Sequence, residues 1–209
     1  GRRFGKSYLS AWILLIKAIQ STNKDVYYIA PTFQQAKDIM WSLLKDLGRD
    51  LIAQAHENTA TLTLINGRKI YLKGSDREST LRGAGLAYVV MDEMANIKPV
   101  VWEQIIRPTL ADIKGGCLMI GTPAAKNHFF DLYKDALEDD EWDAFQFNST
   151  DNPFLPPEEI EAARKNMSSM AFRQEFEASF ETGSGGIFKE DWFKVDDEPE
   201  EGNFVIAVD

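Results

Sequence analysis

A phosphate-binding sequence followed at once by an amphipathic segment constrains this chain more than any other feature. The chain begins Gly1-Arg2-Arg3-Phe4-Gly5-Lys6-Ser7, which matches the second half of the pattern G-x-x-x-x-G-K-[ST]; the first glycine of that pattern would fall just before Gly1. A glycine here lets backbone N–H groups close on phosphate oxygens, a lysine reaches the outer phosphates, and a serine hydroxyl ligates Mg²⁺. The motif therefore predicts a helix that starts near Lys6 and a polyphosphate bound at its beginning.

Apolar segments alternate between helical and strand periods along roughly the first 150 residues. Helices are predicted at 6–21, with Leu9, Trp12, Ile13, Ile16 and Ile19 on the apolar face, and at 127–136. Another helix is predicted after Pro31-Thr32, where apolar residues recur at helical spacing from Ala36 to Leu47 and Gly48 ends the helix. Strands are predicted at 26–30, 88–91, 117–120 and 144–147, with a hairpin at 61–65 and 69–72 that turns through Asn66-Gly67 in type I′ geometry. The runs at 88–91 and 117–120 are continuously apolar, which is typical of buried parallel strands. This order predicts an α/β fold with a parallel sheet and flanking helices.

Composition narrows the class of protein. The chain has 209 residues, a net charge of −10 and one cysteine, Cys117, so an internal disulfide and a cysteine-based zinc site are excluded. No apolar run approaches the 18 residues of a membrane span, and we expect a soluble protein in a reducing compartment. The negative charge argues against a protein that coats nucleic acid, although a motor that touches few phosphates at a time stays open.

The predicted strand at 88–91 ends in Asp92-Glu93, and the one at 117–120 ends in Gly121-Thr122-Pro123. Carboxyl ends of parallel strands meet at one edge of a sheet, so we expect these residues beside Gly5-Lys6-Ser7. There Asp92 could hold Mg²⁺ through its water shell, Glu93 could polarise an attacking water, and Thr122 could bond the terminal phosphate or that water. An acidic surface turn and an ordinary strand-end turn are the alternatives.

Three arginines are candidates for contact with phosphate. Arg2 and Arg3 lie in the phosphate loop itself, where an arginine can reach the terminal phosphate of its own subunit. Arg82 lies on a glycine-flanked loop ahead of the acidic strand and could serve a neighbouring subunit. The alternative for Arg2 and Arg3 is a surface or structural ion pair, and the alternative for Arg82 is a solvent-exposed arginine.

After residue 150 the composition changes. Short helices are predicted at 157–166 and 169–177, followed by Gly183-Ser184-Gly185-Gly186 and an acidic stretch at 196–201. We therefore predict an ATPase-like domain over 1–150, a linker region over 151–203, and the first strand of a further domain over 204–209, which ends in Asp209.

In order and spacing, these motifs resemble the large terminase subunit of tailed bacteriophages, an ATPase and nuclease that packages DNA into procapsids. The segments that carry the resemblance are 1–7, 28–32, Leu81-Arg82-Gly83, Val90-Met91-Asp92-Glu93, 121–123, 149–153 and 172–176. Two departures accompany it: the strand before the phosphate loop and the adenine-binding segment are absent, and the nuclease stops at its first acid. We expect a central piece of a longer polypeptide.

The resemblance implies an additional-strand, RecA-like phosphate-loop NTPase fold, followed by a helical linker and the start of an RNase-H-like nuclease. By analogy, ATP is bound by Arg3, Gly5, Lys6, Ser7 and Asp92, and its Mg²⁺ by Ser7 and Asp92. Hydrolysis depends on Glu93 and Thr122, together with one arginine. That arginine is either Arg2, acting in cis, or Arg82, acting in trans. Asp209 would be the first Mg²⁺ or Mn²⁺ ligand of the nuclease.

The same resemblance implies partners and a place of action. The partners are double-stranded viral DNA, the portal protein, the small terminase subunit and further copies of the chain, which form a ring on the portal. In isolation the protein would be a monomer. It would act in the host bacterial cytoplasm and would not bind a membrane. Two other interpretations stay open. One is a helicase-like ATPase, which should continue into a second RecA-like domain. The other is a nucleotide-binding module without turnover.

Overall fold

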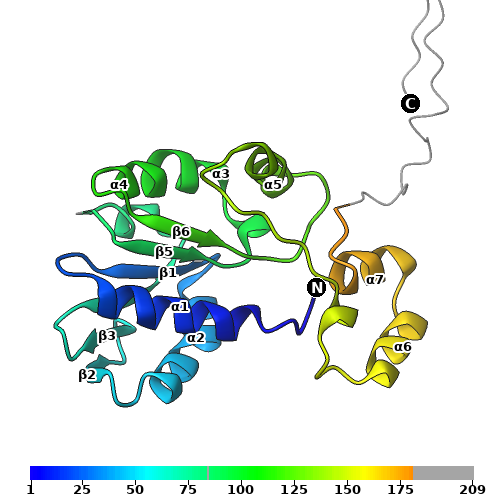
Figure 1. Cartoon of the computed structure of the whole chain (residues 1–209), viewed down its shortest axis with the longest axis horizontal. Helices are drawn as coiled ribbons and strands as arrows, with labels where there is room; N and C mark the ends of the chain where they lie inside the picture. Colours follow the sequence, from blue (N-terminus) through cyan, green and yellow to red (C-terminus); the bar gives the residue numbers. More distant parts are fainter. Residues whose placement is uncertain (84, 181–209) are drawn as a thin grey trace, which may run out of the picture.

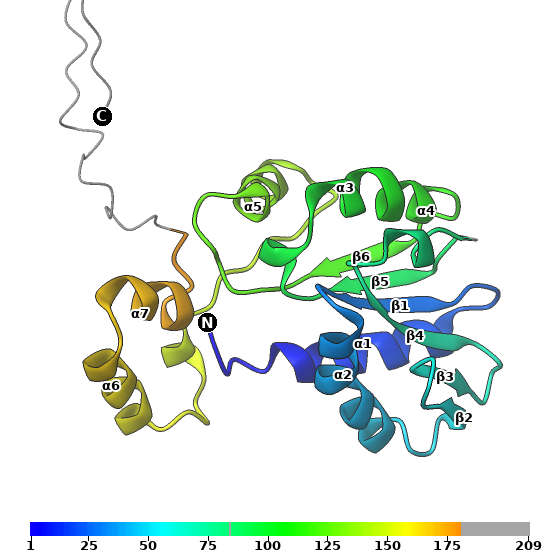
Figure 2. The same cartoon turned by 180° about the vertical axis from the view of Figure 1, so that it is seen from behind.

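The computed structural model describes residues 1–83 and 85–180 (Figures 1 and 2). The helices are α1 (Lys6–Gln20), α2 (Phe33–Leu47), α3 (Pro99–Val101), α4 (Arg107–Ala111), α5 (His128–Glu138), α6 (Pro157–Asn166) and α7 (Ser169–Phe176). A π-helical turn, Trp102–Ile106, joins α3 to α4, and 3₁₀ turns occupy Glu78–Thr80, Met94–Asn96 and Ser149–Asp151. The strands are β1 (Val26–Ala30), β2 (Ile52–His56), β3 (Thr61–Leu64), β4 (Lys69–Gly74), β5 (Tyr88–Met91) and β6 (Gly116–Met119).

The strands form one six-stranded sheet in the order β2-β3-β4-β1-β5-β6. Strands β4, β1, β5 and β6 are parallel, whereas β2 and β3 join antiparallel at the β4 side. The predicted α/β fold is therefore confirmed, and the predicted hairpin extends the parallel sheet rather than standing apart from it. All four parallel strands deliver their carboxyl ends to one edge, where ligands of such sheets collect.

Alternation along the strands divides the core into two layers, one on each face of the sheet. Tyr28 and Val90 point to the face that α1 and α2 cover, together with Leu14 of α1. Ile29 and Met91 point to the opposite face, which the segment from α3 to α4 covers. Figure 1 shows α1 and α2 on one side of the strands and α3, α4 and α5 on the other. Since side chains alternate, Asp92 continues the Val90 row and emerges on the face of α1.

Most of the apolar face predicted for α1 is wrong, although Ile19, which belongs to that face, packs against the core. Leu9, Trp12 and Ile16 are 54%, 46% and 47% exposed. The buried residues of the helix are Ser10, Ala11, Leu14, Leu15 and Ala18. Nearly every turn of α1 carries apolar residues on more than one side, so periodicity alone does not distinguish the faces; the small side chains let the helix lie close to the sheet.

Three further local predictions differ from the structure. The segment 144–147 is not a strand. The strand predicted to be buried at 117–120 corresponds to β6, which is only half-buried along its length because it lies at the edge of the sheet. The turn between β3 and β4 is not type I′, because only Gly67 has a positive φ (80°) and Asn66 does not. Instead, the N–H of Gly67 donates to the carbonyl of Leu64, as in a three-residue hairpin loop.

Helices α6 and α7 form a small unit beside the start of the chain (Figures 1 and 2). Leu155, Ile160 and Phe172 make its own apolar cluster. The helices predicted at 157–166 and 169–177 are confirmed, the second ending at Phe176. The glycine-rich segment, the acidic stretch, the strand predicted at 204–209 and Asp209 lie outside the described residues. Within the part of the chain that is described, no helix is long and apolar enough to cross a membrane.

Candidate active site at the carboxyl ends of the strands

The phosphate loop leads into α1 through Gly5, whose φ of 93° is left-handed. A side chain at Gly5 would meet open space, so the backbone conformation and not crowding requires glycine. Among the described residues no side chain caps α1, which leaves the N–H groups of its first turn available to an anion. Lys6 Nζ donates to the carbonyl of Gly1 at 3.0 Å, so its ammonium folds back over the loop.

Asp92 is 4% exposed at the end of β5 and has a donor on each carboxylate oxygen. The hydroxyl of Tyr28 donates to Oδ2 at 2.5 Å, and the backbone N–H of Glu93 donates to Oδ1 at 2.8 Å. Burial raises the pKa of Tyr28 far above its ordinary value, and the charge of Asp92 raises it further. Tyr28 is therefore neutral and serves as the donor.

Glu93 adopts φ 52° and ψ 46°, a left-handed conformation that costs a non-glycine residue about 1–3 kcal/mol and clusters at functional sites. Burial raises the pKa of its carboxyl, and the neighbouring Asp92 charge raises it further. The charge of Lys6 and a hydrogen bond donated by the N–H of Thr122 act in the opposite direction. The structure thus brings Lys6, Asp92, Glu93 and Thr122 together, as the sequence predicted.

Gly121 makes this convergence possible by close packing. A Cβ at Gly121 would lie 3.1 Å from the backbone N of Met94 and 3.4 Å from Cα of Glu93. The turn after β6 therefore passes directly against the turn after β5, and a larger residue would force the two apart.

Glu175 of α7 is a site residue that the sequence analysis missed. Its carboxylate lies 3.9 Å from the guanidinium of Arg2, and its carbonyl accepts from the N–H of Arg2 at 2.7 Å. Its charge also contributes to raising the pKa of Glu93. In the sequence the segment 172–176 carries only a family resemblance, and no local signal shows that it returns to the loop.

The segment just before α6 also holds the phosphate loop. Ser149 Oγ donates to the carbonyl of Arg2 at 2.7 Å, and Asn152 Nδ2 donates to the carbonyl of Arg3 at 2.6 Å. Phe147 stacks on Phe4 of the loop, with ring centroids 4.6 Å apart. Arg2 and Arg3 are both exposed, and their backbone carbonyls, more than their side chains, fix the loop in place.

Arg82 is an exposed residue of the loop that leads from the 3₁₀ turn Glu78–Thr80 to β5. The loop ends at the amino end of β1, where the N–H of Ala87 donates to the carbonyl of Asp25. Asp92 and Glu93 lie at the opposite end of the parallel strands. Of the two proposed arginine fingers, Arg2 has contacts beside the phosphate loop of its own chain, through the carbonyl and the carboxylate of Glu175.

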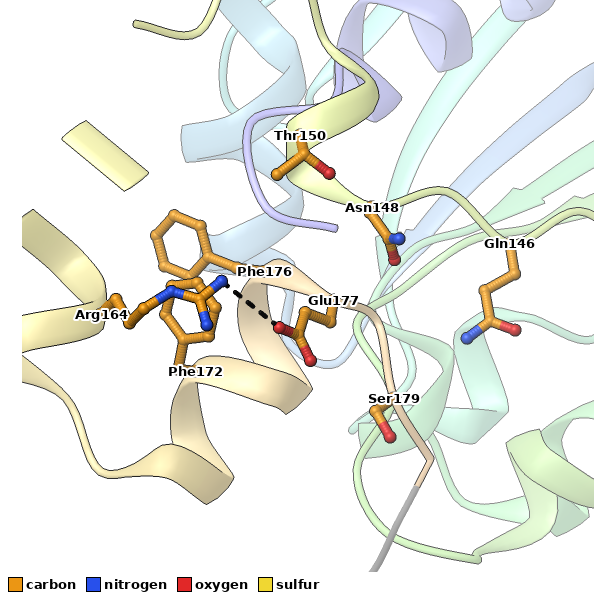
Figure 3. Close-up of a pocket in the computed structure, with 8 residues that line it drawn as sticks. All are labelled: Gln146, Asn148, Thr150, Arg164, Phe172, Phe176, Glu177 and Ser179. Carbon is orange, nitrogen blue, oxygen red and sulfur yellow. Dashed lines mark ion pairs between the residues drawn. The ribbon is translucent and has the colours of Figure 1, made fainter. Parts of the chain in front are cut away.

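A separate cavity of about 420 Å³ lies between α6, α7 and the segment ahead of them (Figure 3). Its lining residues are Gln146, Asn148, Thr150, Arg164, Phe172, Phe176, Glu177 and Ser179. Arg164 lies over the ring of Phe172 at 4.4 Å and pairs with Glu177 at 3.7 Å. None of the residues predicted to contact nucleotide lines this cavity, so it is distinct from the phosphate loop.

An α/β sheet whose strand ends gather a Gly-Lys-Ser loop, a buried aspartate and an adjacent glutamate is typical of the phosphate-loop NTPase class. Within that class, residues 1–195 match the family described as terminase large subunit, T4likevirus-type, N-terminal. The chain belongs to this family.

Individual proteins similar in sequence to this chain are also terminase large subunits. The chain is 29% identical over 194 residues to the terminase large subunit of Escherichia phage T5 and 26% identical over 230 residues to that of Thermus virus P23-45. Each alignment covers 90% of this chain but only 44% and 46% of the relatives, so the chain spans less than half their length.

Solved structures show the same fold. The large terminase ATPase domain of Thermus phage P74-26 superposes with a TM-score of 0.73 at 25% identity, covering 86% of both chains. The large terminase of another thermophilic bacteriophage, solved with ADP, superposes with a TM-score of 0.72 at 18% identity, covering 85% of this chain and 46% of that one. The chain therefore has the fold of a large terminase ATPase domain.

Proposed function

We propose that this chain is the ATP-hydrolysing part of a viral DNA-packaging motor. The observation that carries the proposal is the position of Glu93. It has a left-handed backbone directly after the buried Asp92, and its carboxylate accepts from the N–H of Thr122 and is subject to the charge of Lys6. Membership of the terminase family and the ADP-bound relative support the choice of ATP.

Each residue then has a physical task. Lys6, Gly5, Arg3 and the free N–H groups of α1 bind the phosphates, because a helix start and an ammonium both favour negative charge. Ser7 and Asp92 offer hydroxyl and carboxylate oxygens, the donor set that Mg²⁺ prefers when substrate phosphates supply the rest. When bound, the ion would neutralise charge that develops on the phosphates.

Hydrolysis needs an in-line water beside the terminal phosphate. Glu93 orients and polarises that water, and Thr122, whose N–H already donates to Glu93, contacts the water or the phosphate. Arg2 in cis, or Arg82 from a neighbouring subunit, stabilises the charge of the transition state.

The family extends the proposal to the complete protein. Its substrate would be double-stranded viral DNA, and its partners the portal protein, the small subunit and further copies in a ring, acting in the host cytoplasm. Asp209 would provide one Mg²⁺ or Mn²⁺ ligand of a nuclease whose other carboxylates come from elsewhere, because two-metal cleavage needs several.

A packaging assay tests this function. Procapsids, DNA and ATP are combined with the complete protein or with Lys6→Ala, and DNA protected from added nuclease is measured. We expect the unaltered protein to protect DNA and Lys6→Ala to protect none, because it cannot hold the phosphates; Lys165→Ala, an exposed lysine on α6, serves as the matched control. Packaging by Lys6→Ala at the normal level would contradict the proposal.

A further inference from the structure

Tyr28 places a hydroxyl inside an otherwise apolar layer. It is fully buried on β1 among Leu14, Leu72 and Val90, and its backbone pairs in register with Val90 of β5. A hydroxyl taken out of water without a partner costs roughly 1–3 kcal/mol in proteins, and phenylalanine would fill the same space without that cost. The hydroxyl therefore has a reason to be there other than packing.

That reason is the carboxylate of Asp92, two residues beyond Val90 on the same face of the sheet. Tyr28 Oη lies 2.5 Å from Oδ2, and the N–H of Glu93 holds Oδ1 at 2.8 Å. With one donor on each oxygen, the carboxylate cannot rotate about its Cβ–Cγ bond without breaking a hydrogen bond. Each oxygen still has a lone pair for a further partner.

We propose that Tyr28 is a positioning residue that fixes Asp92 in the orientation needed to hold nucleotide-bound Mg²⁺. This inference rests on the proposed function, since it assigns Tyr28 a part in that same site. Outer partners that orient a metal-binding group commonly change metal affinity or activity about 10–100-fold when they are removed. Tyr28 is fully buried, and it acts only through its hydrogen bond to Asp92.

The test compares Tyr28→Phe with Tyr27→Phe in the complete protein. Both changes delete one phenolic oxygen from β1, but Tyr27 is half-buried on the opposite face, with its ring edge-on to Tyr71 at 5.4 Å. ADP affinity is measured by titration calorimetry with and without Mg²⁺, and ATP hydrolysis is measured across a range of Mg²⁺ concentrations.

We expect Tyr28→Phe to bind ADP without metal as the unaltered protein does, within about twofold. The strengthening of ADP binding by Mg²⁺ should fall about tenfold, and the Mg²⁺ concentration for half-maximal hydrolysis should rise by about the same factor. At saturating Mg²⁺ the turnover number should return to within about threefold of the unaltered value. Tyr27→Phe should match the unaltered protein throughout.

Two outcomes would overturn the inference alone. One is an unchanged Mg²⁺ dependence in Tyr28→Phe. The other is a turnover number reduced equally at every Mg²⁺ concentration together with a lower melting temperature, which would show a packing role. If the unaltered protein neither binds Mg·ADP nor hydrolyses ATP, the proposed function fails, and the inference fails with it.

Discussion

At the scale of single residues, the left-handed backbone of Glu93 is the feature of the site that most strongly indicates a function. A left-handed glutamate persists only where its surroundings fix it, and here Gly121 packs against its Cα while the N–H of Thr122 meets its carboxylate. The charges of Lys6 and Asp92 both act on the carboxylate that this backbone carries. A glycine at 93 would relieve the strain but would supply no carboxylate, so stability and function oppose each other at this position.

Some site residues could be predicted from the sequence because their signals are local. The Gly5-Lys6-Ser7 loop and the acids after β5 each have a local sequence pattern, and the fold of a parallel sheet brings strand ends together. Tyr28, Ser149 and Glu175 could not be predicted this way. Each acts on a residue between 64 and 173 positions away in the chain, and only the tertiary arrangement brings the partners together.

The hydrogen bond from Ser149 to the loop gives a residue-scale prediction. Ser149 is fully buried, and Ser149→Ala would leave the carbonyl of Arg2 without its donor at 2.7 Å. We expect nucleotide affinity to fall about fivefold, equivalent to about 1 kcal/mol for one lost hydrogen bond, while the fold is kept. Calorimetric titration with Mg·ADP measures this; the exposed neighbour Thr150→Ala is the control, and equal affinities of both variants would show that the bond does not order the loop.

At the scale of elements, the sequence pattern of α1 predicts the position of the helix but not its buried face. The helix is predicted at the correct place because the motif fixes its start and apolar residues recur along it. Its buried face is not predicted, because the choice between two apolar faces depends on how closely the sheet approaches. Leu14 is fully buried, and Leu9 is 54% exposed.

Truncating each leucine checks the corrected face. Leu14→Ala should lower the free energy of unfolding by about 2–5 kcal/mol, since it opens a cavity against the sheet. Leu9→Ala should change it by no more than about 0.5 kcal/mol, as exposed positions usually do. Denaturant unfolding followed by circular dichroism measures both, and a larger loss from Leu9→Ala than from Leu14→Ala would restore the face predicted from the sequence.

The segment 144–147 is the opposite case, in which an alternating pattern does not become a strand. Phe145 and Phe147 alternate with other residues, yet they are 72% and 44% exposed and stack on each other instead of joining the sheet. Phe147 also stacks on Phe4. The aromatic residues at alternate positions therefore connect this segment to the phosphate loop. A local sequence pattern does not reveal that contact.

At the scale of the whole molecule, the position of Arg82 bears on assembly. It is exposed on the loop that leads from the 3₁₀ turn Glu78–Thr80 into β5, and an exposed arginine there is available to the site of a neighbouring subunit. In a ring each subunit would then complete the site of the next.

Mixed subunits test this arrangement. Arg82→Ala and Glu93→Gln should each be nearly inactive alone on procapsids, while an equimolar mixture should recover about a quarter of the normal ATPase rate, from interfaces that join an intact Glu93 to an intact Arg82. A mixture of Lys6→Ala with Glu93→Gln is the control and should recover nothing. If the first mixture is as inactive as its parents, Arg2 becomes the arginine that acts on the terminal phosphate.

The Glu93→Gln variant of the complete protein tests most directly whether the carboxylate of Glu93 drives hydrolysis. Nucleotide binding and turnover are measured side by side in this variant. We predict Mg·ATP affinity within about threefold of the unaltered protein and a turnover number lower by roughly 10²-fold or more, as when a positioned base is removed. The exposed Glu103→Gln should leave both quantities unchanged. Normal turnover in Glu93→Gln, with binding intact, would contradict the assignment of this site as an ATPase centre that works through Glu93.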